Sequence, residues 1–330
     1  MEKEFERYGL SITRQNMANW MIRLSEEYLS VLYNYLHKKF YSYHVIQADE
    51  TPLLVNKDGR AANSKSYMWV YRTGYLYEKP IILYEYQKTR NTSHPRQLLK
   101  YYKGICVTDG YQVYNKLEGE LEELTIGGCW VHCRRRFDNA LNQIPKEAQK
   151  GTVAYLAMQQ ILAIYREEGK LKELASEKRL AQRQAMIKPL VDTFFVFIKQ
   201  HTGEISTKYS LGEALGYALN QEKHLRVFLT DGDVPLDNNA SERAIRSFTV
   251  GRKNWVMIDT INGARSSAII YSIAETAKAN SLKPYDYFEH LLTEIPKLMD
   301  KTTDEAEREL EKLLPWSHEL PSNIHKPVKV

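Results

Sequence analysis

The stretch "YHVIQADETPLLV" (residues 43–55) decides how the rest of the chain is interpreted. Polar and apolar residues tend to alternate in it and several side chains are β-branched, a pattern that predicts a strand. Alternation also assigns the two faces, so that Asp49 shares one side with Gln47 and Thr51 while Glu50 projects to the other. The predicted strand therefore carries a carboxylate, Asp49, among mostly apolar neighbours.

More strands are expected downstream, joined by turns and short helices. The expected strands lie at 66–74, 79–87, 104–110 and within 124–133, and the expected short helices lie at 93–102 and 111–118. Three strands in a meander, followed by helix, strand, helix and strand, are the opening order of a ribonuclease-H-like domain. The predicted fold class is therefore α/β, with a ribonuclease-H-like mixed sheet flanked by helices.

Helical periodicity dominates both ends and the middle of the chain. Residues 11–40 form one expected helix with Ser11 or Thr13 as N-cap, and Ser210-x-x-Glu213 has the spacing of a capping box. Further helices are expected at 134–143, 146–168, 170–200, 208–229, 239–248, 263–279 and 284–296, with a short segment at 250–258 between two of them. A large all-helical insertion therefore precedes the helix that begins near residue 239.

These elements divide the chain into four predicted parts. They are an N-terminal helical segment at 1–41, a ribonuclease-H-like core at 42–140 and 237–280, a helical insertion at 141–236, and a C-terminal helical tail at 281–330.

The composition is that of a globular protein with a mildly basic balance. The 330 residues are 43% hydrophobic and 26% charged, with a net charge of +5. Three cysteines exclude a disulfide scaffold and suit a reducing compartment, and the N-terminus has no apolar core of a signal peptide. The longest apolar run, "FFVFI" (194–198), is far too short to span a membrane. We therefore expect a cytoplasmic protein without a membrane partner, and a polyanionic partner fits the charge without being required by it.

Three carboxylates are expected to meet at one edge of the predicted sheet. Asp109 ends the strand at 104–110, which neighbours the strand of Asp49 in a ribonuclease-H order, and ligand sites gather at the carboxyl ends of such strands. Glu242 lies at the polar border of the helix in "PLDNNASERAIRSF" (235–248), facing the sheet edge. Such a cluster is tolerable when divalent cations occupy it, and two Mg²⁺ or Mn²⁺ ions held by Asp49, Asp109 and Glu242 could drive phosphodiester chemistry.

Each acid also has a structural interpretation. Asp49 could cap a turn before Pro52, and Asp109 could belong to an ordinary Asp-Gly turn. Glu242 has the spacing of a capping box with Asn239 as N-cap. The ordered set of three is harder to explain in this way than any single member.

Six short motifs, taken in order, resemble one family. They are "ADET" (48–51), "TDGY" (108–111), "GCWVHCRRRF" (128–137), "DNNASERAIR" (237–246), "VGRKNW" (250–255) and "AETAKANSLKPYDY" (274–287). Together they resemble the transposase of the insertion sequence 66 family, over about residues 5 to 316. The resemblance implies an Asp-Asp-Glu enzyme with a ribonuclease-H-like core, whose triad falls on Asp49, Asp109 and Glu242.

The motif after the second aspartate adds a histidine. Cys129-x-x-His132 resembles a pattern found at this place in many transposases of the class, which implies a supporting catalytic role for His132; a hydrogen-bonded histidine at a strand end is the alternative. A zinc site of Cys129, His132 and Cys133 is disfavoured because no second ligand pair stands at suitable spacing.

Basic residues follow both motifs. Arg134 and Arg135, together with Arg136, follow His132, and Arg243, Arg246, Arg252 and Lys253 follow Glu242. We expect them to bind DNA phosphates on the rims of the site, and a solvated basic face is the alternative.

The expected function is metal-dependent cleavage of DNA at the ends of an insertion sequence and joining of the 3′ ends to target DNA. Expected partners are element-end and target DNA, a second copy in a homodimer or larger synaptic complex, and accessory proteins encoded by the same element, all at the nucleoid. Compared with typical family members, the sequence lacks an N-terminal zinc-binding segment and most of a helix-turn-helix. Two alternatives therefore stay open: a non-catalytic DNA-binding or dimerising regulator of a full-length transposase, and another ribonuclease-H-like nuclease such as a junction resolvase.

Overall fold

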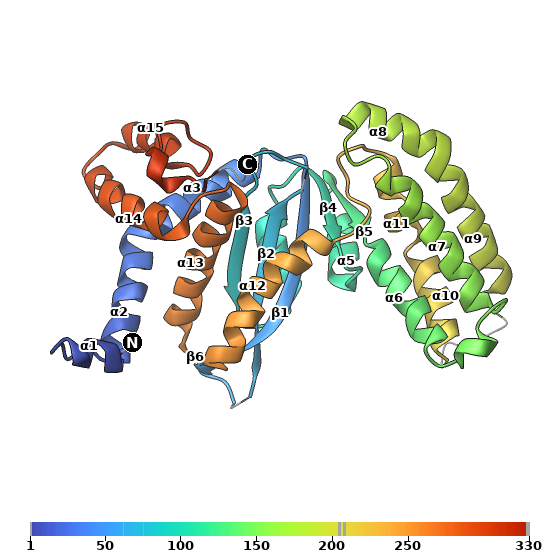
Figure 1. The fold of residues 1–330 in the computed structure, drawn as a ribbon, viewed down its shortest axis with the longest axis horizontal. Coiled ribbons are helices and arrows are strands. Elements are labelled where there is room, and N and C mark those ends of the chain that lie inside the picture. The colour runs from blue at the N-terminus through green and yellow to red at the C-terminus, as the bar shows by residue number, and fades with distance from the viewer. Residues whose placement is uncertain (1, 62, 75, 204–205, 207–208, 328–330) are drawn as a thin grey trace.

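The computed structural model describes residues 2–61, 63–74, 76–203, 206 and 209–327, with only the backbone described at 252–255. A mixed sheet stands at the centre, between an N- and C-terminal helical group and a separate helical block (Figure 1). Its strands are β1 (Val45–Lys57), β2 (Lys65–Thr73), β3 (Ile82–Gln87), β4 (Gly104–Thr108), β5 (Leu124–Gly128) and β6 (Ile258–Thr260). A mixed sheet flanked by helices was predicted and is confirmed.

The strand order is β3-β2-β1-β4-β5, with β6 paired to the far end of β1. The β1–β2 and β2–β3 pairs are antiparallel, whereas β1–β4 and β4–β5 are parallel. β1 runs through Pro52, which lacks an N–H donor. Pro52 lies opposite Tyr67 in the β1–β2 register, beyond Gln47, the last residue of β1 in the described pairing with β4.

Helices cover both faces of the sheet. Those outside the helical block are α1 (Glu2–Arg7), α2 (Arg14–Leu24), α3 (Ser30–Phe40), α4 (Ser93–Leu99), α5 (Gln112–Glu120), α12 (Asn239–Trp255), α13 (Ile261–Ala279), α14 (Pro284–Glu294) and α15 (Thr303–Leu313). One face buries Ile46, Ala48 and Trp69 with α3, α5 and α14. The other face buries Leu53 and Val55 against α12 and the start of α13. The two faces of β1 therefore lie in different cores, as its alternation predicts.

The predicted helix at 11–40 is observed from Arg14 to Phe40, with a π-helical turn between α2 and α3. Thr13 is its N-cap, and its hydroxyl accepts a hydrogen bond from Asn16 N at 3.1 Å. Figure 1 shows α1 and the start of α2 extending away from the sheet.

α13 covers the outer edge of the sheet. Ser272 Oγ accepts a hydrogen bond from Tyr84 N at 2.7 Å, and Thr276 Oγ1 bonds both the N–H and the carbonyl of Ile82 at 3.0 Å. An unpaired edge strand invites association with other chains, and side chains of the helix satisfy this one.

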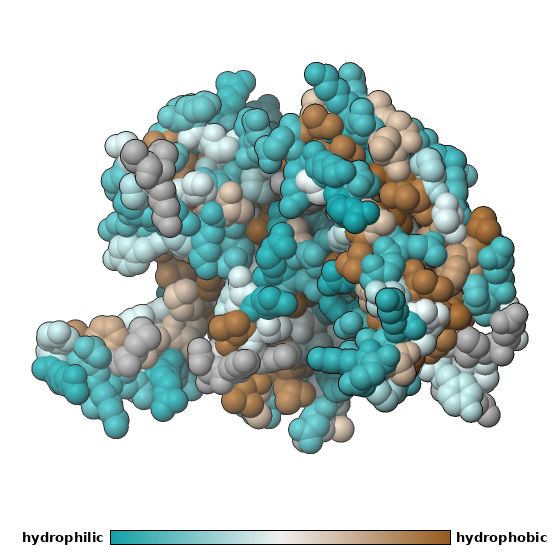
Figure 2. All heavy atoms as spheres, turned by 45° about the vertical axis from the view of Figure 1, so that its right-hand side comes forward, coloured by the Kyte–Doolittle hydropathy of each residue, from teal (hydrophilic) through white to brown (hydrophobic). Residues whose placement is uncertain are grey.

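The helical block has its own core, which joins the sheet through Val45, Ile105 and Val107. Its helices are α6 (Trp130–Leu141), α7 (Val153–Gly169), α8 (Ser176–Gln182), α9 (Lys188–His201), α10 (Ser210–Asn220) and α11 (Glu222–Leu225). Seen as spheres, the block shows apolar patches among hydrophilic side chains (Figure 2). Leu156, Leu162, Met186 and Val196 are exposed apolar residues of its helices. No helix in the described ranges is both long and apolar enough to cross a membrane.

Three local predictions were wrong. The helix expected from residue 134 begins earlier, at Trp130, because the strand found within 124–133 already ends at Gly128. The helix expected to end near 248 continues through Gly251 to Trp255. Ser210 is not an N-cap, because α10 is preceded by Tyr209 and has no side-chain cap.

Candidate active site

The two aspartates lie side by side at the carboxyl end of β4. Gln47 of β1 pairs with Val107 of β4. Asp49 lies two residues after Gln47 within β1, and Asp109 lies two residues after Val107, just after β4 ends. Asp49 Oδ1 accepts a hydrogen bond from Glu50 N at 2.8 Å, and Asp109 Oδ1 accepts one from Tyr111 N at 2.9 Å. Both carboxylates are thus oriented by backbone amides close to the point where β1 and β4 separate.

The turn after Asp109 requires a glycine. Gly110 has a φ of 89°, a conformation that side chains with a Cβ rarely adopt, and a Cβ there would lie 2.8 Å from Tyr217 Oη. Tyr217 Oη also donates a hydrogen bond to the Asp109 carbonyl at 3.0 Å. The Asp-Gly turn that the sequence suggested is real, and the Asp109 carboxylate beside it accepts the hydrogen bond from Tyr111 N.

Asn238, at the start of α12, connects the three segments of the site. Its Nδ2 donates to Ala48 O at 2.8 Å, directly before Asp49, and its Oδ1 accepts from Gln47 Nε2 at 3.1 Å. Its N–H donates to Cys129 Sγ at 3.2 Å, and its carbonyl accepts from Glu242 N at 3.2 Å. Asn238 is fully buried, so these bonds fix where the first turn of α12 lies relative to β1.

Glu242 faces α6 across the site. Its Oε1 lies 3.8 Å from His132 Nε2, and its Oε2 lies 3.6 Å from Arg135 Nη2. The capping box proposed for Asn239 and Glu242 is not observed, because Asn239 N instead donates to Asp237 Oδ1 at 3.0 Å. Glu242 Oε1 is buried and makes no hydrogen bond within the described residues. The carboxylate is therefore available for a ligand.

His132 lies in the first turn of α6, where the strand-end interpretation would have placed it in an extended segment. Its Nε2 is 3.4 Å from Arg135 Nη1, and its Nδ1 is buried and has no hydrogen-bond partner in the described part of the chain. Burial lowers the pKa of His132, although the nearby Asp109 and Glu242 oppose this shift. The imidazole thus lies within the electrostatic reach of two of the three acids.

The charges of the acids act on one another. Burial, together with repulsion from Glu50, Asp109 and Glu242, raises the pKa of Asp49 to about 8. Burial and Asp109 likewise raise the pKa of Glu50 to about 7, against the attraction of Arg90. Such a shift marks a buried set of acids with too few cations around it, a feature of functional sites.

Glu50 was not predicted as part of the site, because alternation places it on the opposite face of β1. Its side chain is 2% exposed and accepts a hydrogen bond from Arg90 Nε at 2.7 Å. The Arg90 guanidinium in turn lies 3.7 Å from the centroid of the Tyr111 ring. The sequence does carry a signal for Glu50: it is a charged residue on the apolar face of a strand, and such a residue needs a buried partner.

The described side chains form no ready-made cluster of three or more His, Cys, Asp and Glu residues at metal-binding spacing. The donor set nevertheless suits a hard divalent cation, because it consists of carboxylate oxygens, one of them without a partner. The disfavoured zinc site receives no support, since Cys129 and Cys133 are buried and Cys129 Sγ accepts a hydrogen bond from Asn238.

We expect Asp49→Asn to stabilise the protein at high pH. An acid whose pKa is raised in the folded state contributes stability below its unfolded pKa of about 4, and this contribution is lost as the pH rises to about 8. Asparagine does not titrate, so without metal ions the variant should melt at least several degrees above the wild type near pH 9 and close to it near pH 4. Differential scanning calorimetry in EDTA measures this, with the exposed Asp138→Asn as control. Equal melting curves at all pH values would contradict it.

The predicted DNA-binding arginines occupy different surfaces. Arg135 reaches Glu242, whereas Arg134 lies over the Tyr165 ring at 5.6 Å. Arg243 lines a cavity of about 390 Å³ that it shares with Tyr165, and Arg246 lines a groove of about 780 Å³ with Leu53 and Leu54. The side chains of Arg252 and Lys253 lie outside the described residues.

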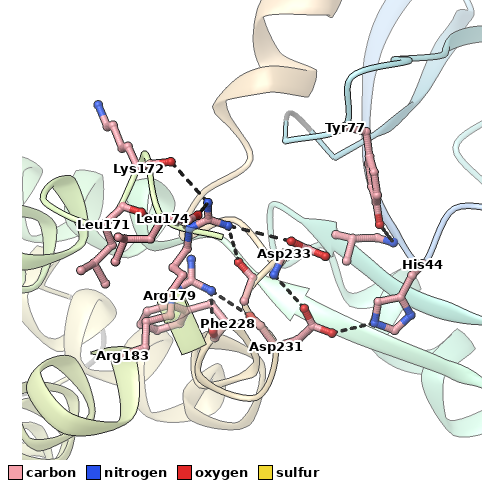
Figure 3. A network of polar contacts seen from close by, with 12 residues as sticks. His44, Tyr77, Leu171, Lys172, Leu174, Arg179, Arg183, Phe228, Asp231 and Asp233 are labelled. Carbon is pink, nitrogen blue, oxygen red and sulfur yellow. Dashed lines mark hydrogen bonds and ion pairs between the residues drawn. The ribbon is translucent and has the colours of Figure 1, made fainter. Parts of the chain in front are cut away.

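Two buried arginines fix the loop that leads to α12 (Figure 3). Arg183 Nη1 donates to Phe228 O at 2.9 Å and to Asp231 O at 2.8 Å, and Arg179 Nη1 donates to Gly232 O at 2.8 Å. Asp231 Oδ2 also lies 2.7 Å from His44 Nε2, directly before β1. The helical block therefore holds the segment that precedes Glu242 and ties it to the strand that carries Asp49.

Two family models and several curated proteins match most of the chain. The model of the family described as "Transposase IS66 family" matches residues 1–266, and that of the "IS66 C-terminal element" matches residues 272–316. The uncharacterized protein y4qI of Sinorhizobium fredii (strain NBRC 101917 / NGR234) is 30% identical over 326 residues, which are 96% of this chain and 58% of that protein. The uncharacterized protein y4jD of the same organism is 26% identical over 323 residues, 95% of this chain and 61% of that protein. The chain thus spans about three-fifths of the length of these curated relatives.

Proposed function

Because the chain belongs to the IS66 transposase family, we propose that it cuts DNA at the ends of an insertion sequence and joins the 3′ ends to target DNA. Asp49, Asp109 and Glu242 are the proposed catalytic residues, on a core of ribonuclease-H type. The strand order β3-β2-β1-β4-β5 supports the core assignment, since it places β1 and β4 side by side as that fold requires.

The observation that carries the proposal is that the backbone segments bearing the three acids are joined to one another, although they are distant in the sequence. Asp49 and Asp109 come from neighbouring parallel strands, and Asn238 binds the backbone next to Asp49 and that of Glu242 at once. Repulsion from Asp109 and Glu242 contributes to the raised pKa of Asp49, so their charges reach it. Separate turn and capping roles would not require the three residues to meet.

The acids are proposed to hold two Mg²⁺ or Mn²⁺ ions. Asp49 is disfavoured as a carboxylate in the buried site, and Glu242 Oε1 accepts no hydrogen bond from the described residues, so both gain from a cation. When bound, two such ions activate the attacking water or hydroxyl and stabilise the leaving 3′ oxygen.

The chain's other residues would orient the substrate. His132 and Arg135 contact Glu242 from α6 and are positioned to hold it or a nearby phosphate. We assign phosphate binding without sequence readout to Arg134, Arg135, Arg243, Arg246, Arg252 and Lys253. Action on two element ends and a target implies a homodimer or larger synaptic complex at the nucleoid, with accessory proteins of the same element as further partners.

A nicking assay on element-end DNA tests the proposed activity. We expect strand cleavage with Mg²⁺ or Mn²⁺ and none in EDTA, because the acids alone would repel the phosphate. Joining is scored separately by supplying an element end with a free 3′ hydroxyl together with supercoiled target DNA. Absence of both products with either ion, or cleavage that persists in EDTA, would contradict the proposal.

A further inference from the structure

A polar cavity opens beside Asp109, between α5, α6 and α10. Its volume is about 530 Å³, within the range of roughly 300–1,000 Å³ that is usual for ligand sites. The described residues that line it include no aliphatic side chain and four amides, those of Gln112, Asn115, Asn220 and Gln221. An apolar ligand would find little to contact there, so the cavity suits a ligand that hydrogen-bonds along its edges.

Two of these amides have unused hydrogen-bonding capacity. Gln221 is 7% exposed, and its Oε1 makes no hydrogen bond within the described residues. Asn115 Oδ1 is also buried and without a partner in the described part of the chain. Gln221 Oε1 lies 3.4 Å from the position that a Cβ on Gly110 would take, directly after Asp109. Buried polar atoms without partners are costly, and a bound ligand would relieve that cost.

The charges around the cavity favour a neutral ligand over a phosphate. Both arginines of the lining are already bound to carboxylates: Arg90 to Glu50 with an Nε–Oε1 distance of 2.7 Å, and Arg136 to Glu213. Asp109 adds a negative charge at the edge of the cavity. A phosphate would meet this carboxylate without an uncommitted arginine to offset the repulsion.

We propose that this cavity binds one unpaired nucleobase of the DNA substrate, an inference that rests on the proposed function. Amide side chains present a donor and an acceptor side by side, which matches the edge of a base, and asparagine and glutamine pair with bases in this way. A base seated there would place its own strand next to Asp109. The cavity would thus select DNA in which a nucleotide near the scissile phosphate has left the double helix.

Binding is measured by fluorescence anisotropy in EDTA, so that no cleavage occurs. Three labelled duplexes differ at one position, which carries an unpaired adenine, an abasic nucleotide or a normal pair. The wild type should bind the unpaired adenine about tenfold more tightly than the abasic site, which has the same backbone but no base. Equal affinities for the adenine and abasic duplexes would overturn the proposal.

Asn115→Leu supplies the matching variant. Leucine removes an amide oxygen that accepts no hydrogen bond from the described residues, so none of these residues loses a hydrogen bond to that oxygen. The variant should bind the adenine and abasic duplexes with similar affinity. Asn142→Leu, at the exposed residue that caps the C-terminal end of α6, should retain the tenfold difference. A preference that persists in Asn115→Leu would overturn the proposal. The binding assay contains no metal, so its result does not depend on nicking. If the wild type prefers the adenine duplex but does not nick element-end DNA with metal, only the proposed function is contradicted. If it nicks DNA but binds the adenine and abasic duplexes equally, only the nucleobase site is contradicted.

Discussion

Asp109→Asn will reduce metal-dependent nicking of element-end DNA by at least about a thousandfold. The two side chains have the same shape, and the asparagine oxygen can still accept the hydrogen bond from Tyr111 N. The change removes one negative charge from the site, and the metal ions it would hold supply several kcal/mol to phosphoryl transfer, where each 1.36 kcal/mol is a factor of ten. Initial rates of nicking with Mg²⁺ and Mn²⁺ measure the effect.

The matched control is Asp138→Asn on α6, an exposed residue that lies outside the candidate site. It should nick at a rate close to the wild type. Both variants should melt within a few degrees of the wild type, so that loss of activity is not loss of fold. Nicking by Asp109→Asn at a rate near that of Asp138→Asn would remove Asp109 from the catalytic set and with it the assigned triad.

Arg183→Met will lower the free energy of unfolding by about 3–5 kcal/mol, the usual cost of breaking a buried ion pair. Arg183 is fully buried, and its Nε donates to Glu168 Oε2 at 3.0 Å. Methionine fills much of the space but leaves Glu168 and the carbonyls of Phe228 and Asp231 without their donor. Urea denaturation followed by tryptophan fluorescence measures the loss.

Two further variants separate the buried pair from a general effect of charge. Arg166→Met removes an arginine whose side chain is 73% exposed, and it should cost less than about 1 kcal/mol. Adding Glu168→Leu to Arg183→Met should recover part of the loss, because both charges are then gone. If Arg183→Met lowers the free energy of unfolding no more than Arg166→Met does, the hydrogen bonds of Arg183 do not stabilise the protein as proposed.

Much of the fold followed from local patterns. Alternation in residues 43–55 gave the faces of β1, and strong 3.6-residue periodicity gave α3, α7, α9 and α13. The failures lie where tertiary contacts override local signals. Gly251 does not end α12, whose apolar residues Ala244, Ile245 and Phe248 pack on the sheet just before it.

The acids of the candidate site could be chosen from the sequence, but their supports could not. Asp49, Asp109 and Glu242 were selected by strand order and by the resemblance. Asn238 stood in the quoted motif, yet its bonds to Ala48 and Cys129 join residues far apart in sequence. The same holds for Glu50 and Arg90, whose pairing depends on how β1 meets the loop after β3.

The helical block between Asp109 and Glu242 also sets a delay during protein synthesis. A ribosome adding about 5–20 residues per second needs on the order of ten seconds to make the chain between the two acids. Until then a nascent chain holds Asp49 and Asp109 but no α12, and Arg179 and Arg183 can hold the loop before α12 only once residues 228–232 have also been made. Because the third acid depends on the block that precedes it, an incomplete translation product lacks the full set of acids proposed to cut DNA.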